Sequence, residues 1–300
     1  MGKTYTLVTG GCGFIGYHLC KKLLSLGHSV VVVDNLSTGS KSNEIKDSEI
    51  KYIYGDTNSL DCVNALFSGY QFTYVYHLAA VVGVQLTLSN PLLVLEDLKG
   101  IDLIFKFSAS SSVEKLFFAS SSEVYGEPFV IPQNEITTPL NSRLPYAIVK
   151  NAGEAYGLAH REQSSLNSTS LRFFNAYGPR QRNDFVISLF IESAIANRPL
   201  NIYGDGSQTR TFCHVEDTAN CMTNLLNPSI NIESINIGSD IQITINELAQ
   251  KIIKFTNSSS TQYTYKSNYF SSWDPFASDF VCIRNTVEPI GSRHRRHIRR

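Results

Sequence analysis

The chain has 300 residues, of which 42% are hydrophobic and 17% charged, with 26 basic and 26 acidic side chains. A chain of this length can bury most of the surface that its unfolded form exposes, so we expect one large globular domain or a domain with an appended lobe. The composition excludes collagen-like, low-complexity and largely disordered chains. The longest apolar runs, such as 30–33, are far shorter than the roughly 20 residues that a membrane span requires, so we expect no membrane contact.

Charge and cysteine distribution narrow the partners and the compartment. Five arginines lie in the last eight residues, and the rest of the chain has 21 basic and 26 acidic residues, so no nucleic-acid partner is expected. We interpret this tail as a solvated terminus, with a basic arm for an acidic partner as the alternative. The six cysteines form no C-x-x-C pair and no dense framework, which favours a reducing, cytoplasmic location.

Periodicity predicts alternating strands and helices along the first half of the chain. It begins with a β-rich run at 4–9 and a helical apolar stripe at 14–26 that ends at Gly27. A run of β-branched residues follows at 29–33, which is too apolar for a half-exposed strand and is typical of a parallel strand covered on both faces. The further strands are predicted at 51–54, 74–78, 115–120 and 168–174, and the helices near 60–68, 92–109 and 146–160. This alternation is typical of an α/β fold with a doubly wound parallel sheet.

The pattern changes after Asn175, which indicates a second, smaller lobe. A helix is predicted over 184–197, followed by a turn-rich segment, and then a strand at 234–237 and a helix at 244–255. We therefore expect a main domain over 1–174, which the chain rejoins over about 234–256, and a mainly α+β substrate lobe over 175–300.

A glycine cluster follows the first predicted strand and opens the first predicted helix. Gly11, Gly13 and Gly16 satisfy G-x-G-x-x-G, a turn that lets a pyrophosphate approach the backbone and the start of a helix. Asp34 ends the second strand, where its carboxylate can accept the adenosine ribose hydroxyls and would repel a 2′-phosphate. The context predicts a Rossmann-type domain that prefers NAD to NADP.

Tyr146 and Lys150 stand four residues apart on a predicted helix and so share one face. A phenol titrates near 10, but an adjacent ammonium and the positive nicotinamide ring favour the phenolate, which can then act as a base on a substrate hydroxyl. Ser121 ends a predicted strand at the edge where α/β sheets bind ligands, and it can hydrogen-bond the same oxygen.

Together these motifs resemble the extended short-chain dehydrogenases that modify nucleotide sugars, over roughly residues 4–255. The resemblance lies in the following stretches: Gly10-Gly11-Cys12-Gly13-Phe14-Ile15-Gly16, Asp34-Asn35-Leu36-Ser37-Thr38-Gly39, Gly55-Asp56, His77-Leu78-Ala79-Ala80, Ser120-Ser121-Ser122-Glu123-Val124-Tyr125-Gly126 and Tyr146 to Lys150. In this reading the first glycine motif is G-x-x-G-x-x-G, through Gly10, Gly13 and Gly16.

The resemblance implies roles for residues along the whole chain. Asp56 and Thr57 would hold the adenine, and Ala79 and Ala80 would line the nicotinamide path. The implied NAD-binding set is Gly10, Gly13, Phe14, Ile15, Gly16, Asp34, Asn35, Asp56, Thr57, Leu78, Ala79, Ala80, Tyr146 and Lys150. The implied positions for the nucleotide-diphosphate sugar are Ser122, Asn175, Arg210 and Arg284. The resemblance also implies a homodimer that pairs through the helices near 92–109 and 146–160, and no metal.

Glu123 bears on the reaction type. A carboxylate there resembles the dehydratases and the glucuronate decarboxylases, since it can take the C5 proton of a 4-keto intermediate, whereas simple 4-epimerases usually carry a small or hydroxyl residue. The same Ser-Glu-Val-Tyr-Gly stretch also occurs in epimerase-like proteins, where the glutamate caps or forms an ion pair. We therefore expect C4 oxidation of a nucleotide-linked hexose by an isomerase or a lyase, with a UDP-sugar 4-epimerase first and a 4,6-dehydratase or UDP-glucuronate decarboxylase as alternatives.

Two departures from the family pattern keep a further alternative open. Asp97 stands where many relatives have an asparagine near the nicotinamide ribose, and an arginine-rich stretch replaces the usual sequence after Pro289. A catalytically silent NAD-binding scaffold is therefore a rival interpretation, which predicts NAD binding without turnover.

Overall fold

The computed structural model describes residues 3–127, 131–260 and 263–266. The strands are β1 (Tyr5–Thr9), β2 (Val30–Asp34), β3 (Ile50–Tyr54), β4 (Phe72–His77), β5 (Lys115–Ser121), β6 (Ser168–Phe173), β7 (Asn175–Tyr177), β8 (Leu200–Tyr203), β9 (Thr209–His214), β10 (Ser234–Ile237), β11 (Gln242–Thr244) and β12 (Tyr263–Lys266). The helices are α1 (Phe14–Ser25), α2 (Leu60–Gly69), α3 (Val84–Ser89), α4 (Pro91–Ala109), α5 (Pro145–Ser164), α6 (Val186–Ile195), α7 (Val215–Asn224) and α8 (Ile245–Thr256), with 3-10 turns η1 (Lys41–Asn43) and η2 (Ser122–Tyr125).

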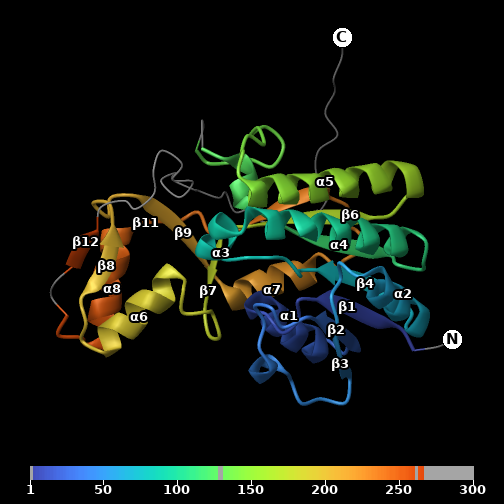
Figure 1. The fold of residues 1–300 in the computed structure, drawn as a ribbon, viewed down its shortest axis with the longest axis horizontal. Coiled ribbons are helices and arrows are strands. Elements are labelled where there is room, and N and C mark those ends of the chain that lie inside the picture. The colour runs from blue at the N-terminus through green and yellow to red at the C-terminus, as the bar shows by residue number, and fades with distance from the viewer. Residues whose placement is uncertain (1–2, 128–130, 261–262, 267–300) are drawn as a thin grey trace, which may run out of the picture.

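The main sheet has seven strands in the order β10-β6-β5-β4-β1-β2-β3, and each pair is parallel. Successive residues of a strand point to opposite faces, so Leu7 packs in one core cluster and Val8 in the other. Figure 1 shows α4 and α5 on one face of this sheet and α1 and α7 on the other. The predicted doubly wound α/β fold is confirmed.

The smaller lobe lies beside the carboxyl end of the main sheet (Figure 1). It contains the sheet β11-β9-β7, the parallel pair β12–β8, and the helices α6 and α8. Its own core includes Phe190, Leu200, Ile202 and Leu248. A capping box between Thr244 and Glu247 begins α8, since each side chain hydrogen-bonds the other residue's backbone.

The stretch 234–256, which we expect to rejoin the main domain, is divided in the structure between the main sheet and the smaller lobe. β10 pairs with β6 at the edge of the main sheet, but α8 packs against α6 in the lobe. Helix α7 shows the opposite difference: it lies in the stretch predicted for the lobe, but it packs on α1 of the main domain. Periodicity identifies the apolar face of a helix but not the neighbour that covers it, so these two helices could not be assigned from spacing.

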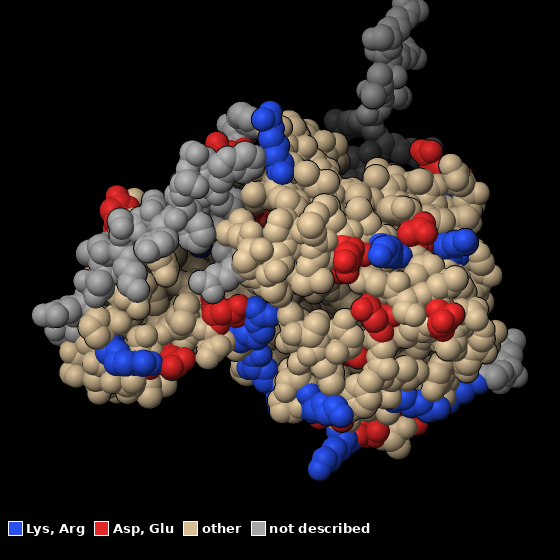
Figure 2. Space-filling view, in the orientation of Figure 1, with Lys and Arg blue, Asp and Glu red and all other residues tan. Residues whose placement is uncertain are grey.

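Acidic and basic side chains are interspersed over the face shown in Figure 2, without one broad basic patch. This distribution agrees with the balanced charge of the chain. Among the described residues, no helix is both long enough and apolar enough to cross a membrane.

Candidate active site

A cavity of about 1580 Å³ opens between the carboxyl ends of the main strands and the smaller lobe. It lies beside β1 and β4, where the chain order of the sheet reverses, which is the usual ligand position in such folds. The predicted site residues that line it are Gly10, Gly13, Phe14, Ile15, Gly16, Asp34, Asn35, Asp56, Thr57, Leu78, Ala79, Ala80, Ser121, Ser122, Glu123, Tyr146, Lys150, Asn175 and Arg210. Arg284 lies outside the described residues.

The turn after β1 has no room for a side chain at Gly10 or Gly16. Gly10 has a φ of +70°, and a Cβ there would lie 2.9 Å from the backbone nitrogen of Ala79. A Cβ on Gly16 would overlap the carbonyl oxygen of Gly10, because α1 begins directly against the turn. The free amides at the start of α1 therefore face a space that a pyrophosphate can enter.

Asp34 is buried next to this turn and is held in one orientation. Its carboxylate accepts hydrogen bonds from the backbone nitrogens of Cys12 at 2.9 Å and Leu36 at 2.8 Å. Asp56, at the end of the neighbouring strand, accepts from the backbone nitrogen of Asn58 at 2.8 Å. A turn without side chains at Gly10, Gly13 and Gly16, beside a buried carboxylate, fits the pyrophosphate and adenosine ribose of NAD.

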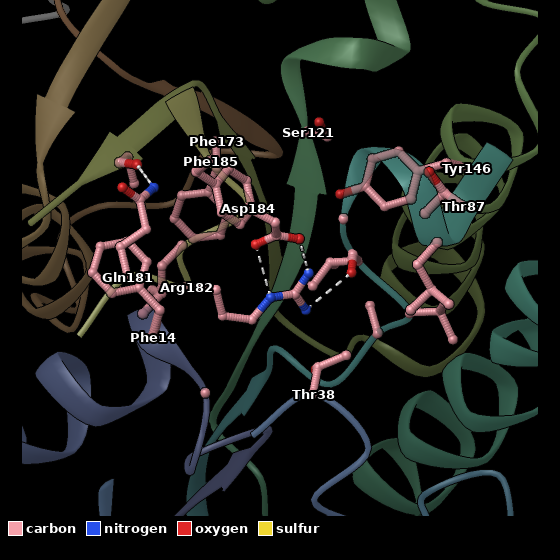
Figure 3. A pocket seen from close by; sticks show the side chains of 18 of the residues that line it. Phe14, Thr38, Thr87, Ser121, Tyr146, Phe173, Gln181, Arg182, Asp184 and Phe185 are labelled. Carbon is pink, nitrogen blue, oxygen red and sulfur yellow. Dashed lines mark hydrogen bonds and ion pairs between the residues drawn. The ribbon is translucent and has the colours of Figure 1, made fainter. Parts of the chain in front are cut away.

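Tyr146 and Lys150 lie one helical turn apart near the start of α5. Figure 3 shows the Tyr146 phenol directed into the cavity that Ser121 also lines. The Lys150 ammonium lies 5.6 Å from the centre of the Tyr146 ring and 5.3 Å from that of Phe118. Burial raises the pKa of Tyr146 to about 12, against the opposing effect of a hydrogen bond with Ser121. Lys150 alone therefore does not produce the phenolate that the sequence predicts.

Lys150 is itself affected by burial and by Asp97. Burial lowers the pKa of Lys150 to about 8, while the Asp97 carboxylate opposes this shift. Asp97 accepts a hydrogen bond from the backbone nitrogen of Val81 at 2.7 Å. Asp97 thus has two effects in the cavity: its side chain fixes the loop after β4, and it favours the charged form of Lys150.

Glu123 lies on η2, which begins directly after Ser121. The Oγ of Ser121 accepts a hydrogen bond from the Glu123 backbone nitrogen at 3.2 Å. The half-buried carboxyl lines the cavity, and burial raises its pKa to about 7 although Arg210 opposes the shift. Glu123 therefore exchanges a proton near neutral pH. Asn175 is anchored nearby by a 3.1 Å hydrogen bond from its amide to the carbonyl of Thr211.

A buried polar network holds η2 in place. The residues of this network were not predicted from the sequence. Arg172 pairs with Glu154 at 2.6 Å and donates to the hydroxyl of Tyr125 at 2.8 Å. Ser120 donates to the same Glu154, and Tyr125 donates to Asn236 at 2.7 Å. The network joins η2 to α5, β6 and β10, so it fixes the turn that carries Glu123.

Arg182 and Asp184 are cavity residues that sequence analysis also missed. The two side chains form an ion pair inside the cavity, and Arg182 donates to the carbonyl of Val82 at 3.4 Å (Figure 3). The available signal was the second arginine in Pro179-Arg180-Gln181-Arg182, directly after the Asn175 motif. Among the residues described, no group of three or more His, Cys, Asp or Glu side chains is placed to hold a metal ion.

Comparison with known proteins identifies the class. The model of the NAD dependent epimerase/dehydratase family matches residues 6–238, and the chain belongs to this family of NAD-dependent enzymes. Its fold is thus that of the nucleotide-sugar epimerases/dehydratases, and its cofactor is NAD.

Three similar proteins have more specific names. A UDP-N-acetyl-alpha-D-glucosaminuronate decarboxylase of Bacillus cytotoxicus is 38% identical over 86% of this chain and 82% of its own length. The UDP-glucose 4-epimerase of Thermotoga maritima, solved with UDP-glucose, has a TM-score of 0.85 at 28% identity and covers 93% of this chain and 89% of its own. The Thermus thermophilus UDP-glucose 4-epimerase, solved with NAD, has a TM-score of 0.81 at 30% identity and covers 88% and 86%.

Proposed function

We propose that this enzyme oxidises C4 of a UDP-linked hexuronate and then releases the sugar carboxyl group as CO2, as a decarboxylase. The observation that carries the proposal is Glu123, which lines the same cavity as Ser121 and Tyr146 with a pKa of about 7. A carboxyl group that is partly protonated at neutral pH can supply a proton to carbon. The similarity to the Bacillus decarboxylase supports this choice over the epimerase that the sequence analysis placed first.

We assign the binding of NAD to the turn residues and carboxylates described above, led by Gly10, Gly13, Gly16 and Asp34. When bound there, NAD would supply the hydride acceptor for oxidation of C4 and the hydride donor for the later reduction. We assign the nucleotide diphosphate to Asn175 and Arg210, since a guanidinium pairs well with phosphate oxygens. Ser122 lies next to Ser121 in the cavity and would contact the sugar.

Tyr146 and Ser121 act on the C4 hydroxyl. The Tyr146 phenolate accepts the hydroxyl proton, and Ser121 donates a hydrogen bond to the same oxygen. The pKa of about 12 must fall for this step. We expect the positive charge of bound NAD to lower it, together with the Lys150 ammonium, which lies 5.6 Å from the centre of the ring. We place Lys150 as the positioning cation for this phenol.

Glu123 acts after oxidation. A 4-keto uronate is a β-keto acid, so the bond between C5 and the carboxyl carbon breaks and its electron pair moves toward the C4 oxygen. Protonated Glu123 then donates its proton to C5, which completes the loss of CO2. Reduction of C4 by the hydride that the bound cofactor would hold, with the proton on Tyr146 returned to the C4 oxygen, would give a UDP-linked pentose.

A 4-epimerase is the second candidate, favoured by the two epimerase structures that share this fold. In that case the hydride returns to the opposite face of C4, and Glu123 serves only to orient the sugar or η2. A 4,6-dehydratase remains the third, with Glu123 taking the C5 proton instead of giving one.

A substrate panel separates these reactions. Purified enzyme is incubated with UDP-glucuronate, UDP-N-acetylglucosaminuronate, UDP-glucose, UDP-N-acetylglucosamine, dTDP-glucose and GDP-mannose, and the products are weighed by mass spectrometry. We expect a uronate to lose the mass of CO2, and Tyr146→Phe to abolish this. Unchanged mass with new stereochemistry, or loss of water, would replace the proposal with the epimerase or the dehydratase. NAD binding without turnover of any substrate would indicate a silent scaffold.

We also propose that the protein is a homodimer, paired through α4 and α5. These helices pack against each other and leave large apolar side chains exposed, among them Leu92 at 77% and Leu158 at 46%. Apolar side chains on adjacent helices favour association with an identical pair, since a two-fold axis makes the surface self-complementary.

A further inference from the structure

The segment 178–182 leaves the smaller lobe after β7 and lies against the main domain. The carbonyl of Pro179 is 2.9 Å from the Nε2 of His18, on α1. Arg180, next in the chain, lines the cavity together with Ser42 and Asn43 of η1. We infer that Arg180 holds this segment closed over the dinucleotide site and thereby slows the release of NAD.

The Arg180 side chain makes a two-part contact with η1. Its Nη1 donates to the carbonyl of Ser42 at 2.7 Å and to the Oδ1 of Asn43 at 2.8 Å. Its guanidinium lies 4.2 Å from the centre of the Tyr17 ring. Hydrogen bonds from a charged donor and a cation–π contact are both stronger than neutral contacts of the same size.

A chain of hydrogen bonds continues from Arg180 to the carboxylate that we assign to the ribose. The buried Asn43 donates through Nδ2 to the carbonyl of Cys12 at 2.8 Å. Cys12 in turn donates its backbone nitrogen to Asp34 at 2.9 Å. These hydrogen bonds thus connect the lobe segment to η1 and to the glycine turn. Arg180 is the residue of the lobe segment that takes part in them.

The backbone of Arg180 has a conformation that favours glycine. Its φ is +70°, in the left-handed region that disfavours a residue with a Cβ. The guanidinium contacts offset this cost. A glycine at this position would keep the turn without strain and would remove only the contacts.

Retention of the dinucleotide suits a cycle in which the hydride is returned to the same sugar. If the reduced cofactor left the site, the sugar would be released at the keto stage. This inference depends on the NAD dependence of the family and not on the choice among the proposed sugars.

Dissociation of the cofactor tests the inference directly. Each protein is loaded with NADH, mixed with excess NAD, and the loss of bound-NADH fluorescence is followed in time. The variants are Arg180→Gly, Asn43→Ala and the double variant, with Arg198→Ala as matched control. Arg198 is a lobe arginine outside the cavity lining whose guanidinium pairs with Glu192 on the surface.

We expect Arg180→Gly to release NADH about tenfold faster, as the loss of charged hydrogen bonds predicts, and Arg198→Ala to match the parent. Asn43→Ala should also speed release, and the double variant should be no faster than the quicker single one, because both belong to one chain of contacts. Melting of the NAD-free proteins should change little for Arg180→Gly, which separates retention from folding.

Unchanged release from Arg180→Gly would overturn the inference. So would equal acceleration by Arg198→Ala, or effects of Arg180→Gly and Asn43→Ala that multiply in the double variant. If Arg180→Gly does not fold, Asn43→Ala decides: release at the parent rate would also count against it.

Discussion

Glu123, Tyr146 and Lys150 all have a pKa displaced from its ordinary value, and burial is the largest cause for each. Burial disfavours the charged form, so it raises the pKa of the carboxyl and the phenol and lowers that of the ammonium. All three residues line one cavity, and the displaced pKa values of Glu123 and Lys150 lie close to neutral pH. Such clustering is typical of catalytic sites.

Glu123→Gln should change the pH dependence of stability. Glu123 titrates near 7 in the folded protein instead of near 4.5, so the folded state binds the extra proton between these values and stability falls as the pH rises through that window. The glutamine variant lacks this loss, and it should be more stable than the parent at pH 8 by up to about 3 kcal/mol, and little changed at pH 4.5. Urea denaturation at the two pH values measures the difference. An equal effect at both would show that Glu123 is not titrating as described.

At the scale of elements, the β1–α1 turn depends on Gly16. Because a Cβ there would overlap the Gly10 carbonyl oxygen, Gly16→Ala should cost about 1–3 kcal/mol of stability and weaken NAD binding by at least roughly tenfold. Gly69→Ala is the matched control, since no atom lies within 4 Å of a Cβ at that position. Urea denaturation and calorimetric titration with NAD measure the two effects. Normal NAD affinity in Gly16→Ala would contradict the role of this turn.

The Glu154–Arg172 pair is a second element-scale test. Both side chains are buried, at 8% and 5% exposure, and they join α5 to β6. Removing one partner leaves a buried charge, so Glu154→Leu or Arg172→Met should each cost about 3–5 kcal/mol in urea denaturation. The double variant should cost much less than the sum, because neither charge remains. Additive losses would show that the pair is not coupled.

For the whole molecule, the proposed dimer can be broken at the α4–α5 surface. Leu92→Glu with Leu158→Glu should convert a dimer to a monomer in sedimentation velocity, because charge in an apolar interface is costly. Leu26→Glu is the control, since Leu26 is 52% exposed at the end of α1, on the other face of the sheet. A parent protein that sediments as a monomer, or a double variant that stays dimeric, would contradict the proposed interface.

Most strands and helices of the main domain followed from periodicity, because each has a strong apolar pattern. β2, for example, is buried along its full length, as a valine run between two helical layers must be. The glycine turn and Asp34 could also be predicted from the sequence, since their proposed function depends on the strand and helix next to them in the chain. The Arg172–Glu154 network and the Arg182–Asp184 pair were not, because charged residues in a sequence give no sign of whether they are buried or which residues they face.

The sequence by itself determined the alternation of elements, the parallel sheet and the residue types that suit a dinucleotide, because these depend on local spacing and on the neighbouring turn. Only the tertiary structure decided that α8 belongs to the lobe and α7 to the main domain, and that Glu123 titrates near 7. It also decided that Arg180 meets η1 from a segment more than a hundred residues away. Those features depend on desolvation and on contacts between distant segments, which arise only when the chain is folded.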